Sequence, residues 1–209
     1  RSGEPDKAIA LMRAILADPL LDAKQIGGNR VATVQMNLAR ALRNQGKYDE
    51  ALPLAQAAAA TAERIYGADN YQTLTLRSTI ASIQDSAGNC AAALPIQRDV
   101  ARRMAARYGK DKQSTLIETG NLGLMEYNCG DRHIAITLLR DVERDLRRQF
   151  GESNAAAQSF RLSLAEALIE QGQRDEARHL LDGLTEQAMQ AAGGDKAELA
   201  RVRGLLAGA

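Results

Sequence analysis

Glycines recur at a fixed spacing along this chain of 209 residues. One series repeats every 42 residues and comprises Gly46, Gly88, Gly130 and Gly172. A second series has the same spacing and comprises Gly67, Gly109, Gly151 and Gly193. An alanine follows each glycine of the first series at the same distance, at Ala51, Ala93, Ala135 and Ala177. Such periodicity is the signature of a solenoid, in which each repeat buries its apolar face against its neighbours.

Each repeat contains two helix-like segments. One lies between two glycines, as in GKYDEALPLAQAAAATAERIYG over residues 46–67, and the other precedes it, as in VQMNLARALRNQG over residues 34–46. In the second example Leu38, Ala41 and Leu42 recur at helical spacing. A glycine just past a helix supplies a left-handed cap without a Cβ clash. Each repeat is therefore predicted to be helix A, a glycine turn, helix B and a second glycine turn.

The composition also favours helices. With no Trp, two Phe and five Tyr, the core must be built from Ala and Leu, which suit close-packed helices better than strands. The 27 basic and 26 acidic residues nearly balance, which gives no reason to expect a nucleic-acid partner. No run approaches the ~18 apolar residues of a membrane span, so we expect no membrane insertion by this chain. The N-terminal RSGEPDKAIA resembles a cut inside a longer protein more than a signal peptide.

Small residues recur in helix A twelve positions before each of those alanines. The pairs are Leu38-Ala39, Ile80-Ala81, Leu122-Gly123 and Leu164-Ala165. This pattern resembles the tetratricopeptide repeat (TPR) family, and the 42-residue period with Tyr/Phe-Gly-x-Asp/Ser endings resembles its kinesin-light-chain type. The chain departs from the family where it lacks the usual Trp and where an aromatic is expected in helix A, at Leu42, Gln84, Glu126 and Leu168. The resemblance implies an all-α, right-handed α-solenoid of TPR-type helix-turn-helix repeats.

We predict a single array over residues 1–209. Its parts are a half-repeat at 3–18, a connector at 19–30, repeats at 31–67, 71–109, 113–151 and 155–193, and a capping helix at 195–207. The half-repeat is a lone helix B, and the capping helix would cover the apolar flank that an open solenoid exposes.

The A helices line the concave surface in the family that the chain resembles. Counting from Asn37 by helical spacing gives one face per helix. These candidate groove residues are Thr33, Asn37, Arg40, Asn44, Thr75, Thr79, Ser82, Ser86, Asn121, Leu124, Asn128, Ser163, Glu166 and Glu170. Most are small and uncharged, whereas a solvated face usually carries Lys and Glu. The resemblance implies that Asn37 and Asn121 grip the backbone of a peptide; the alternative is that small polar side chains merely fit where long ones would collide.

Charge along this face changes sign. It begins with Arg40, beside Arg43, and ends with Glu166 and Glu170, so a gradient could orient an extended peptide. Gly120 lies on the same face, although glycine costs a helix ~1 kcal/mol relative to alanine. Either a ligand approaches closely there, or the glycine serves packing or a kink.

The two cysteines, Cys90 and Cys129, start one predicted helix B and end the next helix A. These helices are antiparallel, and each cysteine lies about as far from the intervening turn as the other. Their Cα atoms can therefore come within the ~7 Å that a disulfide requires. A bridge would imply an oxidising compartment such as the periplasm, whereas two reduced thiols would imply the cytoplasm. Both alternatives stay open.

Catalytic patterns are missing. Neither His133 nor His179 has metal-ligand spacing, and Gly27-Gly28 lacks the lysine of a phosphate loop. The basic pairs Arg102-Arg103 and Arg147-Arg148 have acidic neighbours, which predicts surface ion pairs. We expect no enzyme activity, no metal and no cofactor.

The sequence thus favours a non-enzymatic module that binds an extended protein or peptide segment in its concave groove. We expect it to be the sensor or docking part of a larger bacterial signalling or regulatory protein. The alternative is a scaffold that self-associates through the exposed edge of its N-terminal half-repeat and so forms a homo-oligomer.

Overall fold

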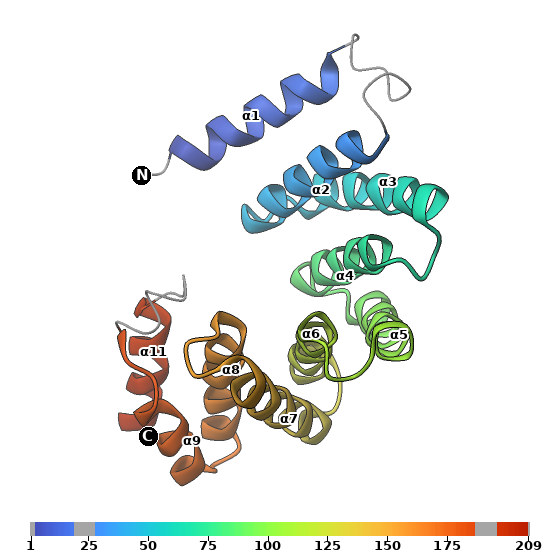
Figure 1. Cartoon of the computed structure of the whole chain (residues 1–209). Coiled ribbons are helices and arrows are strands. Elements are labelled where there is room, and N and C mark those ends of the chain that lie inside the picture. Colours follow the sequence, from blue (N-terminus) through green and yellow to red (C-terminus); the bar gives the residue numbers. More distant parts are fainter. Residues whose placement is uncertain (1–2, 19–27, 187–195, 209) are drawn as a thin grey trace. The chain divides into compact units, whose positions relative to one another are not determined.

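The computed structural model describes residues 3–18, 28–186 and 196–208. These residues form helices and contain no strand, as predicted (Figure 1). The helices are α1 (Gly3–Ala17), α2 (Gly28–Asn44), α3 (Tyr48–Tyr66), α4 (Tyr71–Ser86), α5 (Cys90–Tyr108), α6 (Gln113–Cys129), α7 (Arg132–Phe150), α8 (Ala155–Glu170), α9 (Arg174–Asp182) and α11 (Lys196–Ala207). Most of the predicted connector and Gly193 lie outside the described residues.

The chain divides into two compact units, Arg1–Arg107 and Tyr108–Ala209. In the first unit α3 packs against both α2 and α4, and α1 packs against α2 (Figure 1). In the second unit α7 packs against both α6 and α8, and α8 also contacts α9 and α11. Each B helix at the centre of a unit is therefore covered by the A helices on either side of it. The single array over residues 1–209 stays a prediction.

The glycine turns form mostly as predicted. Gly46 and Gly67 have φ angles of 74° and 86°, in the left-handed region that favours glycine. Gly130 differs, because its φ of −134° lies outside the left-handed region. There α7 is started by Asp131, whose side chain accepts hydrogen bonds from the backbone N–H groups of His133 at 2.8 Å and Ile134 at 3.3 Å. This side-chain cap satisfies backbone N–H groups in the first turn of α7.

Helix B of the last repeat was predicted to continue toward Gly193, but α9 ends at Asp182 with Gly183 as its C-cap. Residues 187–195, which include Gly193, lie outside the described residues. Helix α11 follows the predicted capping helix, and its Leu199 and Val202 are buried in the core of the second unit.

The small residues of the repeat lie where helices meet. All of the predicted seam alanines are 0% exposed: Ala39, Ala51, Ala81, Ala93, Ala135, Ala165 and Ala177. Gly123 takes this place in α6, and a Cβ built on it would lie 3.0 Å from Cγ of Leu139 in α7. Since such contacts leave no room for a larger side chain, the repeat of small residues fixes how closely the helices approach.

Gly120 is explained by packing. A Cβ at this buried position of α6 would lie 2.3 Å from Cζ of Phe160, whose ring comes from α8. Phe160 is itself buried in the core of the second unit. Of the two alternatives drawn from the sequence, the structure therefore supports close helix packing rather than the approach of a ligand.

Gly120→Ala tests this packing. Helix propensity alone would make the substitution stabilising by ~1 kcal/mol, but the displaced Phe160 ring should reverse the sign and lower the free energy of unfolding by about 1–3 kcal/mol. Urea unfolding measures the change, and adding Phe160→Leu should recover part of the loss. Gly204→Ala in α11 is the matched control, because nothing lies within 4 Å of a Cβ there. A stabilised Gly120→Ala variant would contradict the packing explanation.

Candidate functional site

Two arginines of α2 reach across to hydroxyl groups of α4. Nη2 of Arg40 donates to Oγ1 of Thr79 at 3.5 Å, and Nη1 of Arg43 donates to Oγ of Ser82. Arg40 and Arg43 are three residues apart, as are Thr79 and Ser82, so both pairs lie on facing sides of the two helices. These contacts bring together Arg40, Thr79 and Ser82 of the predicted groove face in one place.

Both arginines keep their positive charge available. Neither forms an ion pair with a carboxylate among the described residues. Burial lowers the pKa of the Arg43 guanidinium and nearby Arg40 lowers it further, while Tyr48 and Asp85 act in the opposite direction. Asn44, another predicted residue, accepts from Nη2 of Arg43 at 3.0 Å. Because guanidinium groups bind carboxylates through paired N–H donors, this part of the face is suited to an anionic ligand.

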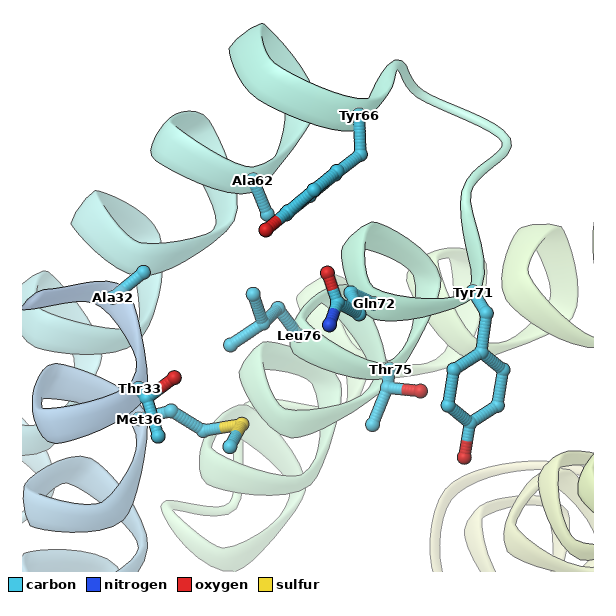
Figure 2. A pocket seen from close by; sticks show the side chains of 9 residues that line it. All are labelled: Ala32, Thr33, Met36, Ala62, Tyr66, Tyr71, Gln72, Thr75 and Leu76. Atoms are coloured by element: carbon cyan, nitrogen blue, oxygen red, sulfur yellow. The ribbon is translucent and has the colours of Figure 1, made fainter. Parts of the chain in front are cut away.

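A pocket of about 210 Å³ opens on the same helices, between α2, α3 and α4 (Figure 2). It is lined by Ala32, Thr33, Met36, Ala62, Tyr66, Tyr71, Gln72, Thr75 and Leu76. Thr33 and Thr75 belong to the predicted groove face, whereas the other lining residues were missed. The tyrosines flank the turn between α3 and α4 and are 37% and 46% exposed. Partly exposed aromatic side chains beside a groove indicate a binding surface. The sequence analysis used Tyr66 only as part of the Tyr/Phe-Gly ending of a repeat and so missed this possibility.

The remaining candidates of the first unit differ in access. Asn37, Asn44 and Ser86 are exposed, and nothing in the structure blocks Asn37 as a backbone-binding residue. Thr79 is buried, and its hydroxyl donates to the carbonyl oxygen of Thr75 at 3.1 Å while it receives Arg40. Thr79 therefore supports the arginine rather than meeting a ligand itself.

In the second unit the candidates are bonded within their own helices. The Asn121 amide donates to Oε2 of Glu118 at 3.2 Å, and the Ser163 hydroxyl donates to the Ser159 carbonyl at 3.2 Å. Leu124 packs against the core of this unit, while Asn128 is exposed. These positions lie along α6 and α8 as predicted, with fewer groups free for a ligand.

The acidic end of the predicted gradient is neutralised. Glu166 pairs with Arg201 of α11 at 2.7 Å. Glu170 accepts a hydrogen bond from the Tyr127 hydroxyl and lies 3.7 Å from Arg132, whose guanidinium sits 5.1 Å from the centre of the Tyr127 ring. Burial and the Glu170 carboxylate raise the pKa of Tyr127 to about 12. The charge available to orient a ligand therefore comes mainly from the arginines of α2.

A second cleft, of about 560 Å³, holds a matched network of charges. Buried Arg161 of α8 donates through Nε to Glu143 and through Nη2 to Glu152, both at 2.8 Å. Arg147 contacts the same carboxylates at 3.2 and 3.1 Å. The hydrogen bond from Arg161 holds the pKa of Glu152 below its ordinary value of 4.5, so its stabilising effect is present above that pH and is lost as the pH falls through the lowered pKa.

Most of the charged residues that line this cleft are paired with one another and therefore have a structural role. The expected ion pairs also form: Arg102 and Arg103 contact Asp99 at 2.6 and 3.4 Å, and Arg148 contacts Asp145 at 3.4 Å. The buried Arg161 was not anticipated, since its role depends on Glu143 and Glu152 from other segments.

Arg161→Met should lower the free energy of unfolding by about 3 kcal/mol, because it leaves buried Glu143 with only Arg147 to compensate its charge. Arg178→Met is the matched control: Arg178 forms an exposed pair with Asp175 at 3.0 Å, and its loss should cost less than ~1 kcal/mol. Chemical unfolding of both variants gives the comparison. Equal effects would mean that burial adds nothing to the Arg161 pairs.

Neither cysteine is a free thiol in the structure, where Cys90 and Cys129 are both disulfide-bonded. The bridge between them, and the oxidising compartment that it would imply, stay predictions.

Thiol titration tests the bridge. The chain unfolded in denaturant without reductant should show no reactive thiol, and the same sample after reduction should show two, the number of cysteines in the sequence. Freshly prepared, unreduced protein with two reactive thiols would overturn the proposed bridge and leave the cytoplasmic alternative.

The described residues contain no cluster of three or more metal-ligating side chains. His133 and His179 are both exposed. No helix in the described parts of the chain combines the length and apolarity needed to cross a bilayer.

Sequence comparison matches residues 30–106 to the profile of the tetratricopeptide repeat. A search of curated proteins finds no significant match.

Several solved structures share the fold. BtubC (BKLC) from P. vanneervenii superposes with a TM-score of 0.72 at 16% identity, over 98% of this chain and 92% of that one. A kinesin light chain from Podosopora anserina with nearly identical TPR-like repeats gives 0.67 at 19% identity, over 86% and 94%. A Rap protein complexed with Competence and Sporulation Factor gives 0.70 at 14% identity; the match covers 98% of this chain but 60% of that one.

Paired helices, small residues at their seams and an open polar face define a protein–protein interaction module of the helical-repeat class. The profile match identifies tetratricopeptide repeats over residues 30–106, and the solved structures show the same helical-repeat fold over most of the chain. A kinesin light chain is among those structures, as the 42-residue period led us to expect.

Proposed function

We propose that this module binds an extended, carboxylate-bearing segment of a partner protein along the face shared by α2 and α4. The observation that carries the proposal is the pair Arg40 and Arg43, which meet only neutral hydrogen-bonding partners across the groove. A carboxylate laid over them would replace neutral hydrogen bonds with charge-assisted ones, which are roughly twice as strong.

The exchange costs little. The contact from Arg40 to Thr79 is 3.5 Å long and thus weak. When Arg40 turns to a ligand, the Thr79 hydroxyl keeps its hydrogen bond to the Thr75 carbonyl at 3.1 Å. No buried polar group is left unpaired by this change, so most of the new interaction energy goes into binding.

The exposed amide of Asn37 lies one turn before Arg40 on the same face of α2. We assign it the role that the family resemblance implies, a hydrogen bond to the backbone of the bound segment. In the second unit Asn121 and Ser163 would act in the same way after releasing partners in their own helices. The first unit therefore supplies the main binding energy.

The wider role follows from the family and from one relative. A Rap protein of the same fold is complexed with Competence and Sporulation Factor, which supports a role in recognising a factor rather than in catalysis. We propose that the chain is the non-enzymatic sensor or docking part of a larger bacterial signalling or regulatory protein. Its nearly balanced charge favours protein over nucleic acid as the partner.

The test starts with peptides selected on the full chain from a random display library and measured by calorimetry. Selected peptides should be enriched in Asp and Glu and should bind with micromolar Kd, roughly −8 kcal/mol. Arg40→Gln with Arg43→Gln should weaken them at least about tenfold, because each charge-assisted hydrogen bond contributes roughly 1.5–3 kcal/mol. Exposed arginines of the B helices provide the control, Arg64→Gln with Arg102→Gln.

Equal affinity of the two double variants would contradict the assigned groove. Light scattering on the same samples addresses the alternative function, self-association, which is favoured by Leu11 of α1 at 63% exposure. A mass that rises with protein concentration and falls with Leu11→Ser would support self-association through the α1 edge instead.

A further inference from the structure

We infer that the pocket between α2, α3 and α4 receives a phenol ring, the tyrosine side chain of the bound partner segment. The inference rests on the proposed function, since Thr33 and Thr75 of this pocket lie on the same helix faces as Arg40 and Thr79. The inference specifies which side chain of the bound segment would occupy this pocket.

The size of the pocket fits one aromatic ring. Its volume is about 210 Å³, whereas a protein cavity of about 150 Å³ is enough to hold benzene. Met36, Leu76 and Ala62 supply apolar surface, and the partly exposed rings of Tyr66 and Tyr71 also line the pocket (Figure 2). Aromatic rings pack against one another edge-to-face or offset, so these tyrosines would border an incoming ring.

The first unit has smaller side chains than the second at three of the positions that line the pocket, and a larger one where Met36 stands in place of Gly120. Three lining residues differ from their equivalents two repeats later: Ala32 from Leu116, Ala62 from Leu146, and Leu76 from Phe160. In the second unit these larger residues are buried in the core, where the Phe160 ring lies against Gly120. The repeat therefore accepts larger side chains at these three positions, and in the first unit the pocket lies beside the smaller ones.

One buried polar atom favours a ring that carries a hydroxyl. Among the described residues, Oγ1 of Thr75 is buried and has no hydrogen-bond partner. Figure 2 shows the hydroxyl on the side of Thr75 that faces Tyr71. A phenol can donate to this oxygen or accept from it, whereas an aliphatic side chain would leave it unpaired and a charged one would meet apolar walls.

Two probes that differ by one hydroxyl test the pocket on the full chain. In methyl NMR titrations p-cresol should shift the Met36, Ala62 and Leu76 resonances and bind roughly two- to tenfold more tightly than toluene, the range expected for one hydrogen bond. Thr75→Val keeps the shape and should abolish this preference without weakening toluene. Thr137→Val, on the exposed side of α7, should keep the preference. An unchanged ratio in Thr75→Val would overturn the role of the hydroxyl.

The second measurement uses a variant in which a larger side chain fills the pocket. Ala62→Leu copies the residue that the second unit carries at this position, so the fold accommodates it, and it should abolish the shifts caused by both probes. Persistent shifts at Met36 and Leu76 in that variant would place the probes elsewhere and overturn the pocket.

N-acetyltyrosinamide separates a partner's side chain from a free phenol. Binding as tight as that of p-cresol supports the tyrosine of a segment, whereas binding of p-cresol alone would overturn it. Failure here is distinguishable from failure of the groove: peptides that depend on Arg40 and Arg43 but compete with neither probe would refute only the phenol pocket. Probe binding without any dependence on the arginines would refute only the carboxylate groove.

Discussion

The close approach of neighbouring helices is the constraint on which the rest of this protein depends. Buried alanine or glycine recurs where the described helices cross, as at Ala39, Ala51 and Gly123, and lets their backbones approach closely. Dispersion forces fall off steeply with distance, so a seam without gaps gains contacts that larger, poorly fitted side chains would lose. The seam also sets the distance between successive A helices, and with it the spacing of the groups on the binding face.

That spacing explains why the face of the first unit is built from long cations and short hydroxyls. The side chains of Thr79 and Ser82 are short, so an arginine of α2 must extend across to α4 to reach their hydroxyl groups. The guanidinium group stays near the surface and its hydroxyl partner is neutral, so its positive charge can still attract an anionic ligand. In the second unit the position that matches Ser82 carries Glu166, which is paired with Arg201. One type of repeat thus provides an open face in one unit and a closed one in the other.

The sequence predicted the helices and the seam well, because both depend on residue types that recur every 42 positions. It was less informative where a helix ends within a repeat, as α9 does at Asp182. The helix faces of the candidate site follow from spacing alone. Spacing does not predict whether each residue on these faces is accessible or paired, because Thr79 is covered by an arginine 39 residues away and Glu166 is paired with one 35 residues away.

Gly120 shows why such states escape a sequence. A mid-helix glycine costs the helix free energy, so some compensating contact must exist, and the sequence alone allows that contact to be a ligand or a ring. Only the position of Phe160 on the neighbouring helix decides between them. The matching position of the first unit carries Met36, with Leu76 in place of the phenylalanine, and there the space beside the helix stays open. Two equivalent repeats can keep the same small residues at the seam and differ in the size of the neighbouring side chains. At such a position a ligand can occupy the space that a larger side chain fills in the other repeat.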